Sequence, residues 1–251
     1  MTIAWIIFFG ILGLLVGSFL NVCIDRLPAK KSLAYPPSHC DTCQHPLKPW
    51  DNIPVFSYLW LRGKCRYCSA KIPQRIMWVE LSTGILFAFL FWRYGLTFEF
   101  PLIAFYTCIL LVLAVIDLNH KLILNVIVYP TAAIALIIGF FLPEFDIYKG
   151  ILGGAIGFTI LMIPALVSRT GMGWGDVKMA GLIGLMTGYP RVFVGLLGGI
   201  ILGGVSAVIL IILKKKTRKD TIPFGPFLAL GAFWALVYGQ EILDWYLALF
   251  I

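Results

Sequence analysis

The sequence predicts an all-α polytopic membrane protein of about eight transmembrane helices with one small polar insertion. Of the 251 residues, 60% are hydrophobic, and the mean hydropathy is +0.93, whereas soluble domains are closer to half apolar. Several apolar runs approach or exceed the roughly 18–20 residues that span a bilayer. These runs are continuous, whereas the strands of a membrane β-barrel alternate apolar and polar residues.

Hydropathy predicts eight spans along the chain. The first lacks a preceding basic region and is too long for the apolar part of a cleaved signal peptide, so we interpret it as a retained helix. The sixth is short, and the last is long and interrupted by Glu241 and Asp244. We expect a first helix within 1–24, a loop domain at 25–77 and a multi-helix membrane domain at 78–251. The predicted spans are about 3–22, 78–95, 101–117, 122–142, 150–168, 177–190, 192–213 and 222–250.

The distribution of basic residues predicts the orientation. With eight spans, 17 of the 20 lysines and arginines fall on one side, mostly in 25–77 and 214–220. Basic residues concentrate in cytoplasmic loops, so this side faces the cytoplasm and both termini face outward. The net charge of +8 then reflects membrane topology. We therefore expect lipids as partners and no nucleic acid.

The predicted cytoplasmic loop at 25–77 needs a covalent cross-link or a bound metal to stabilise its structure. It contains seven prolines and lacks a helical period, and about 50 residues of this kind cannot build a strong core alone. Two C-x2-C pairs, separated by 21 residues, supply four thiolates for a tetrahedral structural zinc ion; the separation is one residue beyond the usual range. The predicted zinc ligands are Cys40, Cys43, Cys65 and Cys68.

Other interpretations of these cysteines remain. Two disulfides are the structural alternative, although a reducing cytoplasm disfavours them. His39 and His45 flank the first pair, and either can replace a sulfur ligand. Since four cysteines suffice, we interpret both histidines as solvated. Cys23 and Cys108 lie at or in spans, where a thiol usually packs as a small apolar group.

Two acids at the ends of apolar segments predict a carboxylate dyad. An ionised carboxylate is costly in hydrocarbon, so an intramembrane acid is a functional candidate. Asp117 lies 16 residues after Pro101, which is roughly 24 Å along a helix. Asp176 follows an inner loop, so topology places both acids at similar depth on the cytoplasmic side. Paired carboxylates that share a proton are the catalytic group of aspartic proteases.

The acids also have structural interpretations. Each can cap a helix or pair with Lys121 or Lys178 at the interface. For Asp176 the alternate glycines Gly171, Gly173 and Gly175 favour function, because an extended peptide needs an open approach to a catalytic acid.

Glu80, just inside the second span, is a third acid. It either snorkels to the cytoplasmic interface or supports a site.

The motifs together resemble the type IV prepilin peptidases, the bifunctional leader peptidase/N-methyltransferases of bacteria. The resemblance runs almost end to end, and Gly173-Trp174-Gly175-Asp176-Val177-Lys178 is its most specific part. One departure is Ile123-Leu124-Asn125, where the family usually has a proline. The other matching segments are Gly17 to Val22 with Arg26-Leu27-Pro28, the two cysteine pairs, Val79-Glu80-Leu81 with Thr83-Gly84, Ile116-Asp117 and Pro223 to Pro226.

The resemblance implies an intramembrane aspartic endopeptidase of the bacterial inner membrane. It would remove the basic leader from prepilins or pseudopilins at the cytoplasmic face, with Asp117 and Asp176 as catalytic acids. Gly173, Gly175, Lys178 and Glu80 would support the substrate or the loops. S-adenosylmethionine would then methylate the new N-terminus. The methyl donor rests wholly on the resemblance, since the sequence has no recognisable nucleotide-binding loop.

Two other functions remain open at this point. One is a different G-x-G-D intramembrane protease of the presenilin or signal-peptide-peptidase kind. Those proteins have a Pro-Ala-Leu element late in the chain, whereas this tripeptide occurs here at 164–166, before Asp176. They also lack the cysteine insertion that this chain has. The other is a proton-coupled transporter that uses the same aspartates, which predicts a repeat of hydropathy halves that the sequence does not show.

Overall fold

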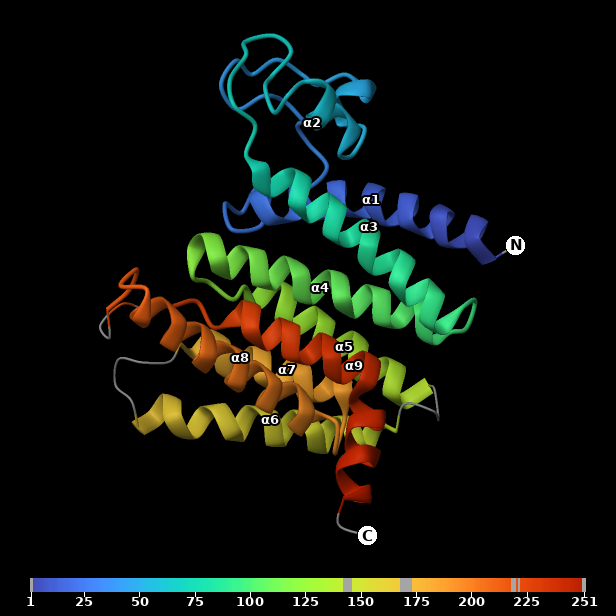
Figure 1. Ribbon diagram of the computed structural model, residues 1–251, viewed down its shortest axis with the longest axis vertical. Coiled ribbons are helices and arrows are strands. Elements are labelled where there is room, and N and C mark those ends of the chain that lie inside the picture. The colour runs from blue at the N-terminus through green and yellow to red at the C-terminus, as the bar shows by residue number, and fades with distance from the viewer. Residues whose placement is uncertain (1, 142–145, 168–172, 218–219, 221, 250–251) are drawn as a thin grey trace. The chain divides into compact units, whose positions relative to one another are not determined.

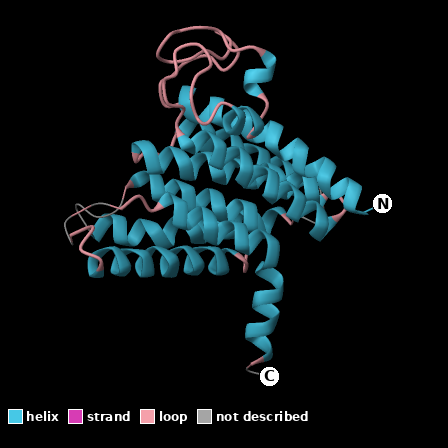
Figure 2. Cartoon of the chain, turned by 45° about the horizontal axis from the view of Figure 1, so that its top comes forward, coloured by secondary structure: helices cyan, strands magenta, loops and turns pink. Residues whose placement is uncertain are grey.

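The computed structural model describes residues 2–141, 146–167, 173–217, 220 and 222–249, and Gly171 lies outside them. Within these ranges the chain is helical, with loops and two isolated bridges but no strand (Figures 1 and 2). This agrees with the predicted all-α class. The helices are α1 (Thr2–Arg26), η1 (Pro49–Asn52), α2 (Phe56–Trp60), α3 (Gln74–Tyr94), α4 (Glu99–His120), α5 (Asn125–Phe141), α6 (Ile147–Val167), α7 (Trp174–Thr187), α8 (Val192–Ile212) and α9 (Gly225–Ala248).

Six of these helices are long and apolar enough to cross a membrane: α1, α3, α4, α6, α8 and α9. The predicted number of eight is not confirmed, because α5 has 17 residues and α7 has 14. At 1.5 Å per residue α7 is about 21 Å long, which is less than the hydrocarbon core of about 30 Å. Both short helices occur where hydropathy predicts a span. The short length of α7 is as expected, whereas α5 is shorter than its predicted span of about 122–142.

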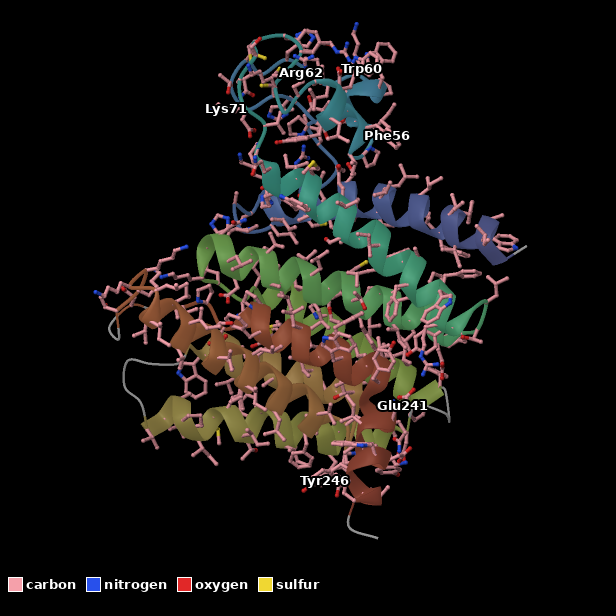
Figure 3. All side chains as sticks on the ribbon, in the orientation of Figure 1. Phe56, Trp60, Arg62, Lys71, Glu241 and Tyr246 are labelled. Atoms are coloured by element: carbon pink, nitrogen blue, oxygen red, sulfur yellow. The ribbon has the colours of Figure 1, made fainter. Side chains whose placement is uncertain are left out.

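The polar stretch after α1 departs from the prediction in two details. Helix α1 continues to Arg26, beyond the predicted end of the span at 22. The loop also contains two short helical pieces, η1 and α2, although its sequence shows no helical period. Residues Phe56 and Trp60 of α2 are exposed, as Figure 3 shows.

The chain divides into two compact units, residues 1–108 and 109–251, and α4 contributes residues to both. In the first unit α1 packs along α3 (Figure 1). Gly17 makes this contact close, because a Cβ there would lie 2.8 Å from the Cα of Glu80. Phe9 stacks on Phe91 with ring centroids 4.5 Å apart. The close contact sets the polar end of α1 beside Glu80.

The second unit is built on two helix pairs, α6 with α7 and α8 with α9. Helix α7 lies inside the unit, and Val177, Met179, Ala180 and Ile183 are fully buried. The last turns of α9 and Leu249, residues 240–249, are mostly exposed. They extend away from the other helices of this unit, and Figure 3 labels Glu241 and Tyr246 in this segment. Their polar residues Glu241 and Asp244 therefore interrupt the predicted span where the helix leaves its packing partners.

Candidate functional site

The four predicted zinc ligands come together in the loop of the first unit. Their sulfur atoms all lie within 4.8 Å of one another, and the Sγ atoms of Cys40 and Cys68 are 3.7 Å apart. Four thiolates at about 2.3 Å from one tetrahedral zinc ion lie about 3.8 Å from each other, so this donor set fits zinc. None of the six cysteines forms a disulfide.

Each cysteine pair is shaped by the same backbone turn. The N–H of Gln44 donates to the carbonyl of Cys40 (2.8 Å), and the N–H of Ser69 donates to the carbonyl of Cys65 (3.0 Å). Gln44 and Ser69 both have a positive φ, 57° and 59°. The two C-x2-C segments thus form the same turn, and each turn directs its two thiols toward a common centre.

Backbone donors prepare one thiol for a metal. The N–H groups of Cys43 and Thr42, together with neighbouring thiols, lower the pKa of Cys40 from 9.0 to about 6. The thiolate is the metal-binding form of cysteine. The two histidines have other contacts: His39 Nδ1 lies 2.9 Å from the carbonyl of Pro37, and His45 packs on Tyr67 with centroids 3.7 Å apart.

The two predicted catalytic acids come together in the second unit. Asp117 lies in the last turn of α4 and is 5% exposed, and Asp176 lies half-buried in the first turn of α7. Their carboxylates are close enough for their charges to interact. Asp117 Oδ2 also accepts the backbone N–H of Gly225 at 2.9 Å, at the start of α9. Three helix ends therefore meet around the pair of acids.

Two glycines of this site permit close approach. A Cβ at Gly225 would lie 2.8 Å from Asp117 Oδ2, and a Cβ at Gly175 would lie 2.9 Å from the Cβ of Ile123. Gly173 is exposed, and the nearest atom to a Cβ there would be Asp176 Oδ2 at 3.7 Å. Gly225 and Gly175 thus permit close packing around the acids, whereas a Cβ at Gly173 would make only ordinary van der Waals contact with Asp176.

Lys178 contacts residues of α5. Its Nζ donates to Asn125 Oδ1 at 3.1 Å and lies 5.8 Å from the ring centroid of Tyr129. The segment without the usual proline still turns, because the N–H groups of Ile127 and Val128 both donate to the carbonyl of Leu124. Lys178 therefore connects the start of α7 to the start of α5.

Glu80 belongs to the first unit and is only 5% exposed. Its Oε2 accepts the backbone N–H of Val55 at 2.8 Å, and Ser18 donates to the same carboxylate. A snorkelling carboxylate would reach solvent, so that interpretation is wrong. Glu80 instead supports the loop at the start of α2.

Sequence reasoning missed the partners of these acids. The N–H of Gly225 is 108 positions from Asp117, and the N–H of Val55 is 25 from Glu80. A backbone donor has no side-chain signature. The only available signals were the Pro-Phe-Gly-Pro segment around Gly225 and the buried position of Glu80 in an apolar run.

Comparison with known proteins identifies the family of the chain. Residues 11–94 match the bacterial peptidase A24 N-terminal domain, and residues 104–208 match the type IV leader peptidase family. Among curated proteins, prepilin leader peptidase/N-methyltransferases are similar to the chain. That of Pseudomonas aeruginosa is 33% identical, covering 94% of this chain and 91% of its own length. That of Bacillus subtilis is 32% identical, covering 94% and 96%. No solved structure matches.

Proposed function

Since the chain belongs to the type IV leader peptidase family, we propose that it is a membrane-embedded aspartic endopeptidase that removes the leader from prepilins or pseudopilins. The observation that supports this most is the meeting of Asp117 and Asp176 at two helix ends. The similarity covers nearly the whole chain, which favours this function over the other intramembrane proteases and over a transporter.

In this proposal the two carboxylates share one proton. The ionised carboxylate takes a proton from water as the water oxygen attacks the scissile carbonyl carbon, and the protonated carboxylate donates to the carbonyl oxygen. The C–N bond then breaks, and the leaving nitrogen takes up a proton. The N–H of Gly225 fixes the orientation of Asp117, and the exposed Gly173, which has no side chain, lets an extended peptide approach beside Asp176. The pair titrates as one unit, so no separate role is assigned to either acid.

We further infer the membrane arrangement from charge and packing. The chain is a multi-pass membrane protein with six long apolar helices. In our proposal α5 and α7 cross as well, because a helix such as α7 that is enclosed by protein need not match the thickness of the lipid. With eight crossings, 17 of the 20 basic residues lie on one side, so the cysteine loop and the aspartates face the cytoplasm.

The loop at 25–77 is, in this proposal, a separate structural domain that binds one zinc ion. Cys40, Cys43, Cys65 and Cys68 have the spacing and the sulfur distances that a structural site needs. The relatives are also named as N-methyltransferases. We therefore include methylation of the new N-terminus by S-adenosylmethionine in the proposed function.

Isosteric variants test the dyad. Asp117→Asn and Asp176→Asn keep the volume and remove the titratable proton. Each is expected to lower cleavage of a verified prepilin by about 10³-fold or more, since general acid–base catalysis contributes up to about 10⁴-fold. The variants should keep the wild-type zinc content and thermal unfolding. Substantial residual cleavage by either purified variant would exclude the dyad.

A further inference from the structure

The first unit contains a cavity of about 760 Å³ that the proposed peptidase mechanism does not use. Its walls come from the end of α1, the start of α3 and the cysteine loop, and every lining residue belongs to residues 18–80. Small-molecule sites have volumes of about 300–1,000 Å³. The cavity therefore has room for a ligand of nucleoside size.

One wall of the cavity contains a buried hydrogen-bond acceptor that has no donor. Asn21 is 5% exposed, and its Nδ2 donates to the carbonyls of Ile76 (3.0 Å) and Gly17 (3.3 Å). Its Oδ1 is buried and has no hydrogen-bond partner. Turning the amide over would set its oxygen against two carbonyls, so the assignment is fixed. A buried acceptor without a partner costs roughly 1–3 kcal/mol, and a ligand with an N–H group would supply the missing donor.

The same wall holds a buried carboxylate. Glu80 is also 5% exposed and lines the cavity. Its carboxylate accepts from the N–H of Val55 and the hydroxyl of Ser18, which are neutral donors. Val55, with φ of 64°, adopts a backbone conformation that β-branched residues avoid, and this turns its N–H toward Glu80. The loop is thus held so that a carboxylate faces the cavity, where it favours a cation.

The loop wall is fastened to α1 by hydrogen bonds and contains aromatic side chains. The guanidinium of Arg26 donates to the carbonyls of Ser32 (2.9 Å) and Pro36 (2.6 Å), which fastens the loop to the end of α1. Tyr35 and Tyr58 line the cavity and offer faces on which a planar ring or a cation can pack.

We propose that this cavity binds the methyl donor S-adenosylmethionine, with its cationic sulfonium held by Glu80 and an N–H group held by Asn21 Oδ1. This deepens the proposed function and rests on its methyltransferase part. A substrate ammonium group alone has the charge but would occupy little of 760 Å³. The sulfonium nucleoside combines a cation, N–H donors and a planar ring, which are the features that these walls complement.

When bound, the donor supplies a methyl group: an N–C bond forms at the pilin's terminal amine, the C–S bond breaks with its electron pair left on sulfur, and the amine proton leaves to water. Glu80 acts through charge on the cation and forms no bond. The product, S-adenosylhomocysteine, is a neutral thioether at sulfur and loses this attraction. Glu80 therefore discriminates between the donor and the product.

That discrimination is the test. Binding of S-adenosylmethionine and of S-adenosylhomocysteine to the full-length protein is measured by titration calorimetry. Glu80→Gln is expected to weaken binding of the donor by about 10-fold or more and binding of the product by less than about 3-fold, since a charged contact contributes roughly 1.5–3 kcal/mol. Binding of the product then reports that the variant has folded.

Two further variants sharpen the result. Asn21→Ala is expected to weaken binding of both ligands. The zinc content of this variant reports whether its cysteine loop is intact. Glu99→Gln is the matched control, an exposed acid of the same unit that does not line the cavity, and should bind both ligands as the wild type does. If Glu80→Gln and Glu99→Gln had equal effects on binding, the proposal that this cavity binds the donor would be refuted. A wild-type protein that cleaves prepilin but binds no donor would overturn the donor site and leave the peptidase proposal intact.

Discussion

The cysteine loop and the aspartate site achieve a defined structure by opposite means. Between residues 27 and 73 only Pro54, Gly63 and Cys65 are buried, so burial contributes little, and in our proposal a zinc ion on four thiols holds the segment. In the second unit Ile116, Val177 and Leu228 of α4, α7 and α9 are fully buried, and glycines let these helix ends approach. A segment without a core depends on a ligand, whereas a site inside a helix bundle depends on packing.

The largest expected effect follows from removing the thiols. Replacing Cys40 and Cys43 with serine is expected to release the metal completely, since serine is a poor zinc ligand. Residues 25–77 should then become sensitive to protease while residues 109–251 stay protected. Elemental analysis and limited proteolysis measure both effects. Purified wild-type protein with four intact thiols and no metal would refute the zinc site.

The converse experiment perturbs the packing around Asp117 and leaves the four thiols unchanged. Gly225→Ala places a methyl group 2.8 Å from Asp117 Oδ2, and overpacking costs about 1–3 kcal/mol. We expect leader cleavage to fall by about 10-fold or more, because about 1.4 kcal/mol corresponds to a factor of ten in rate. Zinc content should be unchanged.

Gly173→Ala is the matched control for Gly225→Ala, since a methyl group there meets nothing closer than 3.7 Å. A smaller loss is expected. If the two alanine variants lost activity equally, the close contact at Gly225 would not be what positions Asp117.

The dependence of zinc binding on pH should report the thiols. With the pKa of Cys40 at about 6, this thiol is already ionised at neutral pH. Zinc binding should therefore release fewer protons near pH 7 than near pH 5, and affinity should fall as pH falls. Calorimetry in buffers of different ionisation enthalpy counts these protons. Equal numbers of released protons at the two pH values would contradict the lowered pKa.

The smallest expected effect concerns which region recognises the substrate. The loop carries nine basic residues between 25 and 77 and is not an obvious clamp for a basic leader. We expect the substrate's hydrophobic helix to supply most of the affinity, through packing among the membrane helices. Polar substitutions in its first turns should raise KM more than charge reversals in the leader. The opposite ranking, with matched peptides in one detergent, would shift recognition to the loop.

Local patterns in the sequence predicted much of this molecule. Apolar runs located eight helices, and the C-x2-C spacing located a sulfur cluster, because both features depend on neighbouring residues. Helix boundaries were less predictable: α5 covers Asn125–Phe141, which is shorter than the predicted span of about 122–142. The contacts of Asp117 with Gly225 and of Glu80 with Val55 could not be predicted, because a backbone donor far along the chain leaves no pattern.

The most direct test of the central claim is to co-express the chain with a candidate prepilin and to determine the mass of the pilin's N-terminus. The proposal predicts a pilin that lacks its leader and carries one added methyl group with the wild-type chain, and an uncut prepilin with Asp176→Asn. A leader that remains on a verified substrate beside folded wild-type protein, or that is removed equally by Asp176→Asn, would contradict it.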